Sequence, residues 1–227
     1  MIGIVCYVGK MTYRHEVHRR TAIGLRSIRM TIFILAALGK LLSWGAASAV
    51  TIGGPFTLTA PDGATVTDAG YRGKWLLVYF GYTHCPDSCP TTLNEMSRVL
   101  AKLGADAVRL QPLFITLDPQ RDTREVLEQY TQSFDGRIIG LTGSAEQINA
   151  VAREYGAYAV QHRTGPGSQD YVIDHSTYLY AMDPEGKFAA AFDSDTSGDR
   201  IADELRELMA RQDEQGVVNT TSPLGGP

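Results

Sequence analysis

In the stretch WLLVYFGYTHCPDSCP, residues 75–90, a strand signal runs directly into a pair of cysteines, and the prediction of the fold starts from it. Residues 75–80 form a continuous apolar run of strand length, which is typical of a strand covered on both faces. Cys85 and Cys89 follow, and on the first turn of a helix this spacing places both sulfurs on one face. Such a pair is able to hold one soft metal ion, or to cycle between dithiol and disulfide. The pair by itself leaves both chemistries open.

The rest of the chain alternates strand and helix signals. An opening hairpin is expected around residues 56–66, and further strands at residues 113–117, 138–141, 171–173, 177–181 and 187–192. Apolar stripes predict four helices: one after the cysteines, one capped by Asp122 with Glu125, one capped by Ser144, and one from residue 201. This order predicts an α/β, thioredoxin-like fold, in which a central mixed β-sheet is flanked by helices and an N-terminal hairpin is added. The cysteines then lie at the carboxyl end of a central strand, where open α/β sheets place their sites.

Three regions are expected along the chain. Residues 1–49 form a signal peptide or membrane anchor, residues 50–212 a single folded domain, and residues 213–227 a polar, disordered C-terminal tail. Five arginines, an apolar stretch and the small residues 47–49 are typical of a secretory signal, whereas Lys40 argues against an uncleaved membrane span. Either reading predicts a periplasmic or extracytoplasmic protein, secreted or anchored to the cytoplasmic membrane.

The charge is distributed unevenly. Residues 1–49 hold seven Lys/Arg and one acidic residue, a net charge of +6, whereas the remaining residues carry a net charge of −10. Because binding to phosphates needs a basic surface, a domain this acidic argues against a nucleic-acid partner. In an oxidising compartment two unassisted thiols tend to form a disulfide, so a reduced pair has to be maintained or ligated.

A copper site needs a third donor besides the two thiolates, and His175 is the best candidate. It lies between two strand-like runs, and the neighbouring Asp174 is able to orient the imidazole or its loop. Two soft sulfurs with one imidazole suit Cu(I) and also accept Cu(II). Zinc in structural sites normally has four ligands, and no fourth is evident.

Three ordered segments resemble the Sco/SenC family of copper proteins. YFGYTHCPDSCP (79–90) is similar to its C-P-D-x-C-P signature, TLDPQRDT (116–123) to its D-P-x-R-D-T segment, and DYVIDHS (170–176) to its D-Y-x-x-D-H-S segment. The resemblance covers roughly residues 51–211. It implies a thioredoxin-like fold in which Cys85, Cys89 and His175 bind one copper ion.

The resemblance also implies a function and partners. Sco proteins are associated with building the dinuclear copper site, CuA, of cytochrome c oxidase subunit II, by delivering copper or by reducing the cysteines of that site. The chain is therefore expected to be a copper-binding assembly protein rather than an enzyme, with the oxidase subunit or another copper-site protein as acceptor. A periplasmic copper donor and a membrane tether through the N-terminal segment complete the expectation.

Two other functions remain open. A thiol-disulfide oxidoreductase would use Cys85 as the attacking thiol and Cys89 as the resolving thiol. Its usual spacing is C-x-x-C, and such proteins carry a cis-proline where this chain has Asp174 and His175. A copper or redox sensor would have the same residues. His84, His162, Asp118 and Asp122 are expected to be neighbours, loop residues or helix caps rather than ligands.

Overall fold

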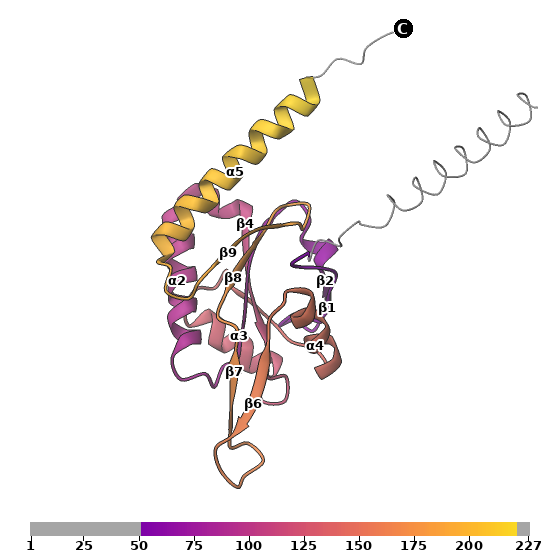
Figure 1. The fold of residues 1–227 in the computed structure, drawn as a ribbon, viewed down its shortest axis with the longest axis vertical. Helices are drawn as coiled ribbons and strands as arrows, with labels where there is room; N and C mark the ends of the chain where they lie inside the picture. The colour runs from indigo at the N-terminus through magenta and orange to yellow at the C-terminus, as the bar shows by residue number, and fades with distance from the viewer. Residues whose placement is uncertain (1–50, 222–227) are drawn as a thin grey trace, which may run out of the picture. The chain divides into compact units, whose positions relative to one another are not determined.

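The computed structural model describes residues 51–221, and their strands and helices follow the predicted order (Figure 1). The strands are β1 (Thr57–Thr59), β2 (Thr65–Thr67), β3 (Trp75–Gly81), β4 (Leu110–Thr116), β5 (Ile139–Leu141), β6 (Ala159–Arg163), β7 (Tyr171–His175), β8 (Leu179–Met182) and β9 (Phe188–Phe192). The helices are η1 (Asp68–Tyr71), α2 (Ser88–Leu103), η2 (Gly104–Arg109), α3 (Arg124–Gln132), α4 (Ala145–Glu154) and α5 (Gly198–Thr221).

The central sheet is mixed, as predicted. Its strand order is β5-β4-β3-β8-β9. β4 runs parallel to β3 and to β5, whereas β8 is antiparallel to β3 and to β9. The strand that precedes the cysteines is therefore the middle strand of the sheet, with a parallel neighbour on one side and an antiparallel neighbour on the other.

Every residue of β3 is buried, because alternate side chains enter two separate cores. Leu77 and Tyr79 pack on the face that carries α2, α3 and α5. Leu76, Val78 and Phe80 pack on the opposite face, which is covered by α4 and the β1–β2 hairpin. The run of apolar residues without alternation thus has the predicted cause, a strand covered on both faces.

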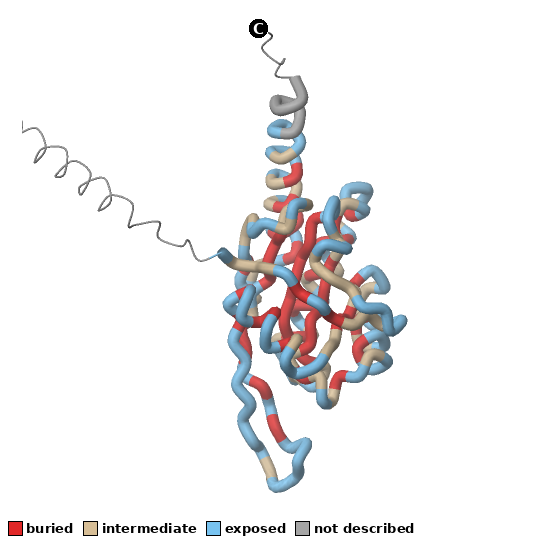
Figure 2. The backbone as a smooth tube through the Cα atoms, turned by 90° about the vertical axis from the view of Figure 1, so that its right-hand side faces the viewer, coloured by how far each residue is buried: buried red, intermediate tan, exposed pale blue. Residues whose placement is uncertain are grey.

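The structure contains one strand that the sequence pattern did not predict. β6 pairs antiparallel with β7, from Ala159 opposite His175 to Arg163 opposite Tyr171. All five residues of β6 are exposed, and Figure 2 shows this hairpin extending away from the buried core. Without a buried face, β6 has no hydrophobic alternation from which to recognise it.

Two predicted regions at the chain ends have different outcomes. The disordered tail was expected to begin at residue 213, but helix α5 continues to Thr221, so that boundary is wrong. Arg109 and Asp213 form a two-contact ion pair at 3.0 and 2.8 Å, which joins this part of α5 to the end of η2. The signal peptide or anchor predicted for residues 1–49 lies outside the described residues.

Candidate metal centre

The three predicted ligands come from three separate segments. Cys85 lies in the loop after β3, Cys89 in the first turn of α2, and His175 at the end of β7. Their sulfur and imidazole nitrogen atoms all lie within 4.8 Å of one another. The distance from Cys89 Sγ to His175 Nε2 is 3.6 Å, and both cysteines are free thiols. The fold therefore brings together all three residues singled out in the sequence.

The close approach of α2 to β3 depends on Gly81, the last residue of the strand. A Cβ atom at this position would lie 2.6 Å from Cys89 Sγ and 2.9 Å from the ring of Phe114. Both distances are far shorter than van der Waals contact, so any larger residue would displace the thiol. Gly81 thus allows the Cys89 sulfur to lie directly against the central strand.

The backbone carbonyl of Ser176, the residue that follows β7, orients the imidazole of His175. Nδ1 lies 2.8 Å from the carbonyl oxygen of Ser176, so Nδ1 carries the proton and donates it to that oxygen. Nε2, the other ring nitrogen, faces the Cys89 sulfur. The rings of Tyr79 and Tyr82 meet the imidazole edge-on, at centroid distances of 6.2 and 5.7 Å. The site therefore holds the imidazole in one orientation, with Nε2 directed toward the sulfurs.

The two sulfurs share their protons unequally. A hydrogen bond from the Cys89 thiol holds the pKa of Cys85 far below its ordinary value of 9.0, against the opposing effect of burial. The Ser88 hydroxyl, 3.2 Å from the Cys85 sulfur, acts in the same direction. The bond to Cys85 and burial raise the pKa of Cys89, which also accepts a hydrogen bond from the Tyr79 hydroxyl at 3.7 Å. The pKa of Cys85 is thus lowered and that of Cys89 raised, which favours Cys85 as the thiolate of the pair.

Cys85 is expected to react with iodoacetamide at nearly the same rate at about pH 6 and about pH 8, because its thiolate is already formed, whereas an ordinary thiol gains about tenfold in thiolate per pH unit. Buried Cys89 should react only after unfolding. Tandem mass spectrometry of the peptide that contains both cysteines identifies the modified sulfur. A tenfold increase per pH unit at Cys85 in the folded protein would contradict this assignment.

Access to the three donors is unequal. Cys89 is fully buried and His175 is 6% exposed, whereas Cys85 is partly exposed. An incoming group therefore reaches the site at the Cys85 sulfur. The other two donors are held inside the protein, against the rings of Tyr79 and Tyr82.

Two thiol sulfurs with one imidazole nitrogen form a donor set that suits copper. Thiolates are preferred by Cu(I), and imidazole is compatible with both copper oxidation states. In the part of the chain that the structure describes, no fourth histidine, cysteine or carboxylate joins this cluster. Structural zinc sites normally have four such ligands, so the donor set fits copper better than zinc.

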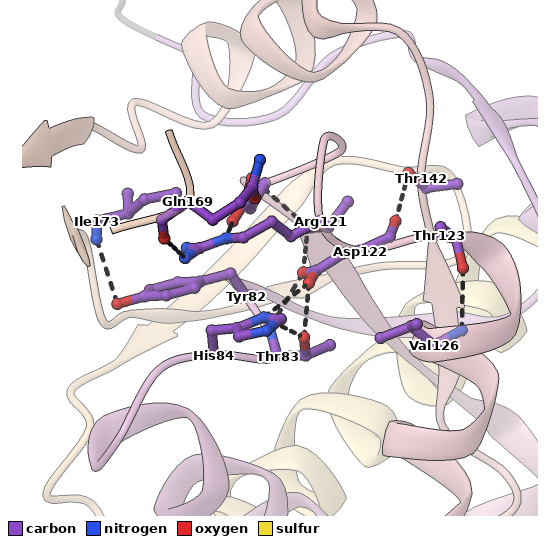
Figure 3. Close-up of polar contacts among 12 residues, drawn as sticks. Tyr82, Thr83, His84, Arg121, Asp122, Thr123, Val126, Thr142, Gln169 and Ile173 are labelled. Atoms are coloured by element: carbon purple, nitrogen blue, oxygen red, sulfur yellow. Dashed lines mark hydrogen bonds and ion pairs between the residues drawn. The ribbon is translucent and has the colours of Figure 1, made fainter. Parts of the chain in front are cut away.

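Asp122 holds the loop that carries Cys85 (Figure 3). Its fully buried carboxylate accepts hydrogen bonds from the backbone N–H of Thr83 at 3.0 Å and from the Thr83 hydroxyl at 2.6 Å. The hydroxyl of Thr116 donates a third bond at 2.7 Å. The sequence predicted Asp122 as a helix cap, and this is wrong: the N-cap of α3 is Thr123, whose side chain accepts from a backbone N–H of that helix.

Asp122→Ala is expected to lower the free energy of unfolding by about 2 kcal/mol or more, because the buried Thr116 hydroxyl and two half-buried donors of Thr83 lose their acceptor, and an unpaired buried donor costs about 1–3 kcal/mol. Urea denaturation of the reduced protein measures this. The matched control is Asp106→Ala, since Asp106 is 52% exposed and lies 3.8 Å from Arg206, its ion-pair partner. A change at Asp122 no larger than that of the control would exclude the proposed loop-holding role.

The remaining candidates lie away from the three donors. His84 is 54% exposed and contacts Thr83 and Asp122 rather than a cysteine. His162 is exposed on β6, as predicted. Asp174 was considered a group able to orient the imidazole, but Ser176 has that role, and Asp174 accepts a hydrogen bond from the Tyr158 hydroxyl at 3.4 Å.

Comparison with known proteins identifies the family. A family model described as SCO1/SenC matches residues 45–210. The chain belongs to the SCO1/SenC family. Among solved structures, the crystal structure of Arabidopsis thaliana ScoI with copper bound has 38% sequence identity and a TM-score of 0.65, covering 70% of this chain and 99% of the solved one. The resemblance and the thioredoxin-like fold predicted from the sequence are both confirmed.

Curated Sco relatives are similar over the same region. "Protein SCO2, mitochondrial" of Saccharomyces cerevisiae is 37% identical over 171 residues, which is 73% of this chain and 57% of the relative. "Protein SCO1 homolog, mitochondrial" of Homo sapiens is 41% identical over 162 residues, 70% of this chain and 53% of the relative. The match thus spans little more than half of the length of these relatives.

These names correct the predicted location. A periplasmic or extracytoplasmic location was expected from the N-terminal segment, but these two curated relatives of this Sco-family chain are named as mitochondrial proteins. That prediction is therefore wrong. Between residues 51 and 221, no helix has the length and apolar character needed to cross a membrane.

Proposed function

We propose that this Sco-family protein binds one copper ion through Cys85, Cys89 and His175, and that it delivers copper to, or prepares, the CuA site of cytochrome c oxidase subunit II. The observation that carries the proposal is the convergence of two free thiols and one oriented imidazole within 4.8 Å. The copper-bound structure of a 38% identical Sco protein supports the choice of metal. The choice of acceptor follows from the family resemblance.

The unequal burial of the donors supports transfer by ligand exchange. Cys85 is the accessible thiolate, so an acceptor thiolate binds the copper ion from that side and replaces the Cys85 sulfur first. Cys89 and His175 are then replaced in turn, and no electron is transferred. The proposal includes a copper donor in the same compartment and a tether through the N-terminal segment.

A second function rests on the reactivity of Cys85, whose pKa is lowered. In this reaction the Cys85 thiolate attacks a disulfide of the partner and forms a mixed disulfide, releasing one partner thiolate. Cys89 then loses its proton and attacks the Cys85 sulfur, so that a Cys85–Cys89 disulfide forms and the partner leaves as a dithiol. The partner is reduced by two electrons, and this protein is oxidised by two.

One experiment separates the two functions. The reduced protein, with and without Cu(I), is mixed with a subunit II fragment whose CuA cysteines are either reduced or joined in a disulfide. Transfer of copper from the loaded protein to the reduced fragment supports delivery. Reduction of the disulfide by the copper-free protein, without metal transfer in the other arm, supports thiol chemistry. If neither copper nor electrons move, both proposals fail.

A further inference from the structure

The segment between β4 and α3 contacts both parts of the site, and Arg121 is its link to the strand that carries His175 (Figure 3). One nitrogen of Arg121, Nη1, donates to the backbone carbonyl oxygens of Gln169 and Tyr171, at 3.2 and 3.1 Å. The guanidinium carbon lies 3.6 Å from the centre of the Tyr171 ring. Arg121 therefore contacts both the backbone and the side chain at the start of β7.

Asp118 completes this contact from the same segment. Its buried carboxylate accepts a hydrogen bond from Nε of Arg121 and another, at 2.7 Å, from the hydroxyl of Tyr171. Arg121, Asp118 and Tyr171 thus form a closed buried group, which we call the β7 clamp. It joins residues 53 positions apart in the chain.

The clamp is not explained by stability alone. The side chain of Arg121 is 9% exposed, and its Nη2 is buried without a hydrogen-bond partner among the described residues. A buried donor that is left unpaired costs about 1–3 kcal/mol. A buried ion pair also gives little net stabilisation to the fold, because the cost of removing both charges from water offsets their attraction. A guanidinium at this position therefore has a cost, for which positioning of the strand offers a reason.

The strand itself is not part of the central sheet, so side-chain contacts attach it to the body of the protein. Within residues 51–221, β7 pairs only with β6, outside the central sheet. Besides the clamp, the backbone N–H of Ile173 donates to the Tyr82 hydroxyl at 3.2 Å, Ile173 packs against Tyr82, and the His175 ring meets Tyr79 and Tyr82 edge-on. Tyr171, Ile173 and His175 share one face of β7, so holding the first of them fixes the direction in which the last points.

We propose that Arg121 is a positioning residue for His175: by clamping the start of β7, it holds the imidazole Nε2 at the two sulfurs. This inference rests on the proposed copper site. Since His175 is the nitrogen donor, loss of the clamp should weaken binding of Cu(II) and leave Cu(I), held by the two thiolates, largely bound. The loss expected for a supporting contact is about 10–100-fold in Cu(II) affinity.

The test compares Arg121→Gln, His175→Ala and the double variant in the full chain, by Cu(II) titration and electron paramagnetic resonance. Arg137→Gln is the matched control, because this substitution removes the same charge from an arginine that is 51% exposed and pairs with Asp135. Arg121→Gln should weaken Cu(II) binding and reduce the nitrogen hyperfine coupling, and Arg137→Gln should change neither. In the His175→Ala background, Arg121→Gln should have no further effect.

Three results would overturn the inference. Unchanged Cu(II) binding in Arg121→Gln would show that Arg121 has no role at the site. A further loss of Cu(II) affinity when Arg121→Gln is added to His175→Ala, or a loss of Cu(I) in Arg121→Gln as large as that of Cu(II), would indicate general destabilisation instead. Urea denaturation of each variant measures that destabilisation directly. If His175→Ala itself leaves Cu(II) binding unchanged, the proposed copper site fails instead, so the two failures are distinguishable.

Discussion

Replacing Cys85 and Cys89 together by serine is expected to abolish stoichiometric copper binding. The three donor atoms lie within 4.8 Å of one another, and the change removes both sulfurs, so that only the imidazole of His175 is left as a donor. The loss should exceed by far the roughly 10–100-fold that removal of an outer contact to a metal ligand costs. Equilibrium dialysis of Cu(I) against a chelator of known affinity measures it.

The control for this variant is Cys6→Ser, which removes the third cysteine of the chain and keeps the pair. It should bind one copper ion per chain, as we propose for the unchanged protein. Serine is close in size to cysteine, so the fold should persist, and circular dichroism verifies this. One copper ion retained after loss of both thiols would refute the site.

His175→Ala is expected to reduce Cu(II) affinity by more than about 100-fold, since it removes a direct ligand rather than an outer contact. Cu(I) should remain bound through the two thiolates, although more weakly. The free-thiol count should stay at two for the pair, because no sulfur is changed. Cu(II) titration by visible absorption and thiol quantification test the two statements separately.

His162→Ala provides the matched control. His162 lies on β6 opposite Val172, and all residues of that strand are exposed. Its removal should leave both copper affinities unchanged. If the two histidine variants lose Cu(II) equally, the nitrogen ligand has been assigned to the wrong residue.

Local sequence patterns predicted most of the sheet and helices correctly. The correct predictions rely on contacts within one element or on burial of a continuous face. They include β3, the helix after the cysteines, and the capping box of Ser144 and Gln147. Such features repeat along the chain at the period of the element. β6 was missed because all of its residues are exposed, so that its sequence shows no alternation of apolar and polar side chains.

The role of Asp122 shows where local reading failed. An aspartate three residues before a glutamate resembles a capping box, yet its carboxylate contacts Thr83, which is 39 residues away. Thr123 serves as the cap instead. No local pattern distinguishes these outcomes, because the competing hydrogen-bond partner comes from another segment.

For Cys85 and Cys89, local patterns were enough to predict the residue types, their spacing and their place just after the central strand. These depend on residues that are close together in the chain. The two cysteines were expected to share the first turn of a helix, but α2 begins at Ser88, so Cys85 lies in the loop before it. The folded structure was needed to show that the pKa of Cys85 is the one lowered, that Nε2 of His175 faces Cys89, and that Asp122 and Arg121 contact the two ligand-bearing segments. Protonation, tautomer and clamping all follow from distances between segments that are far apart in the chain, and such distances exist only once the chain has folded.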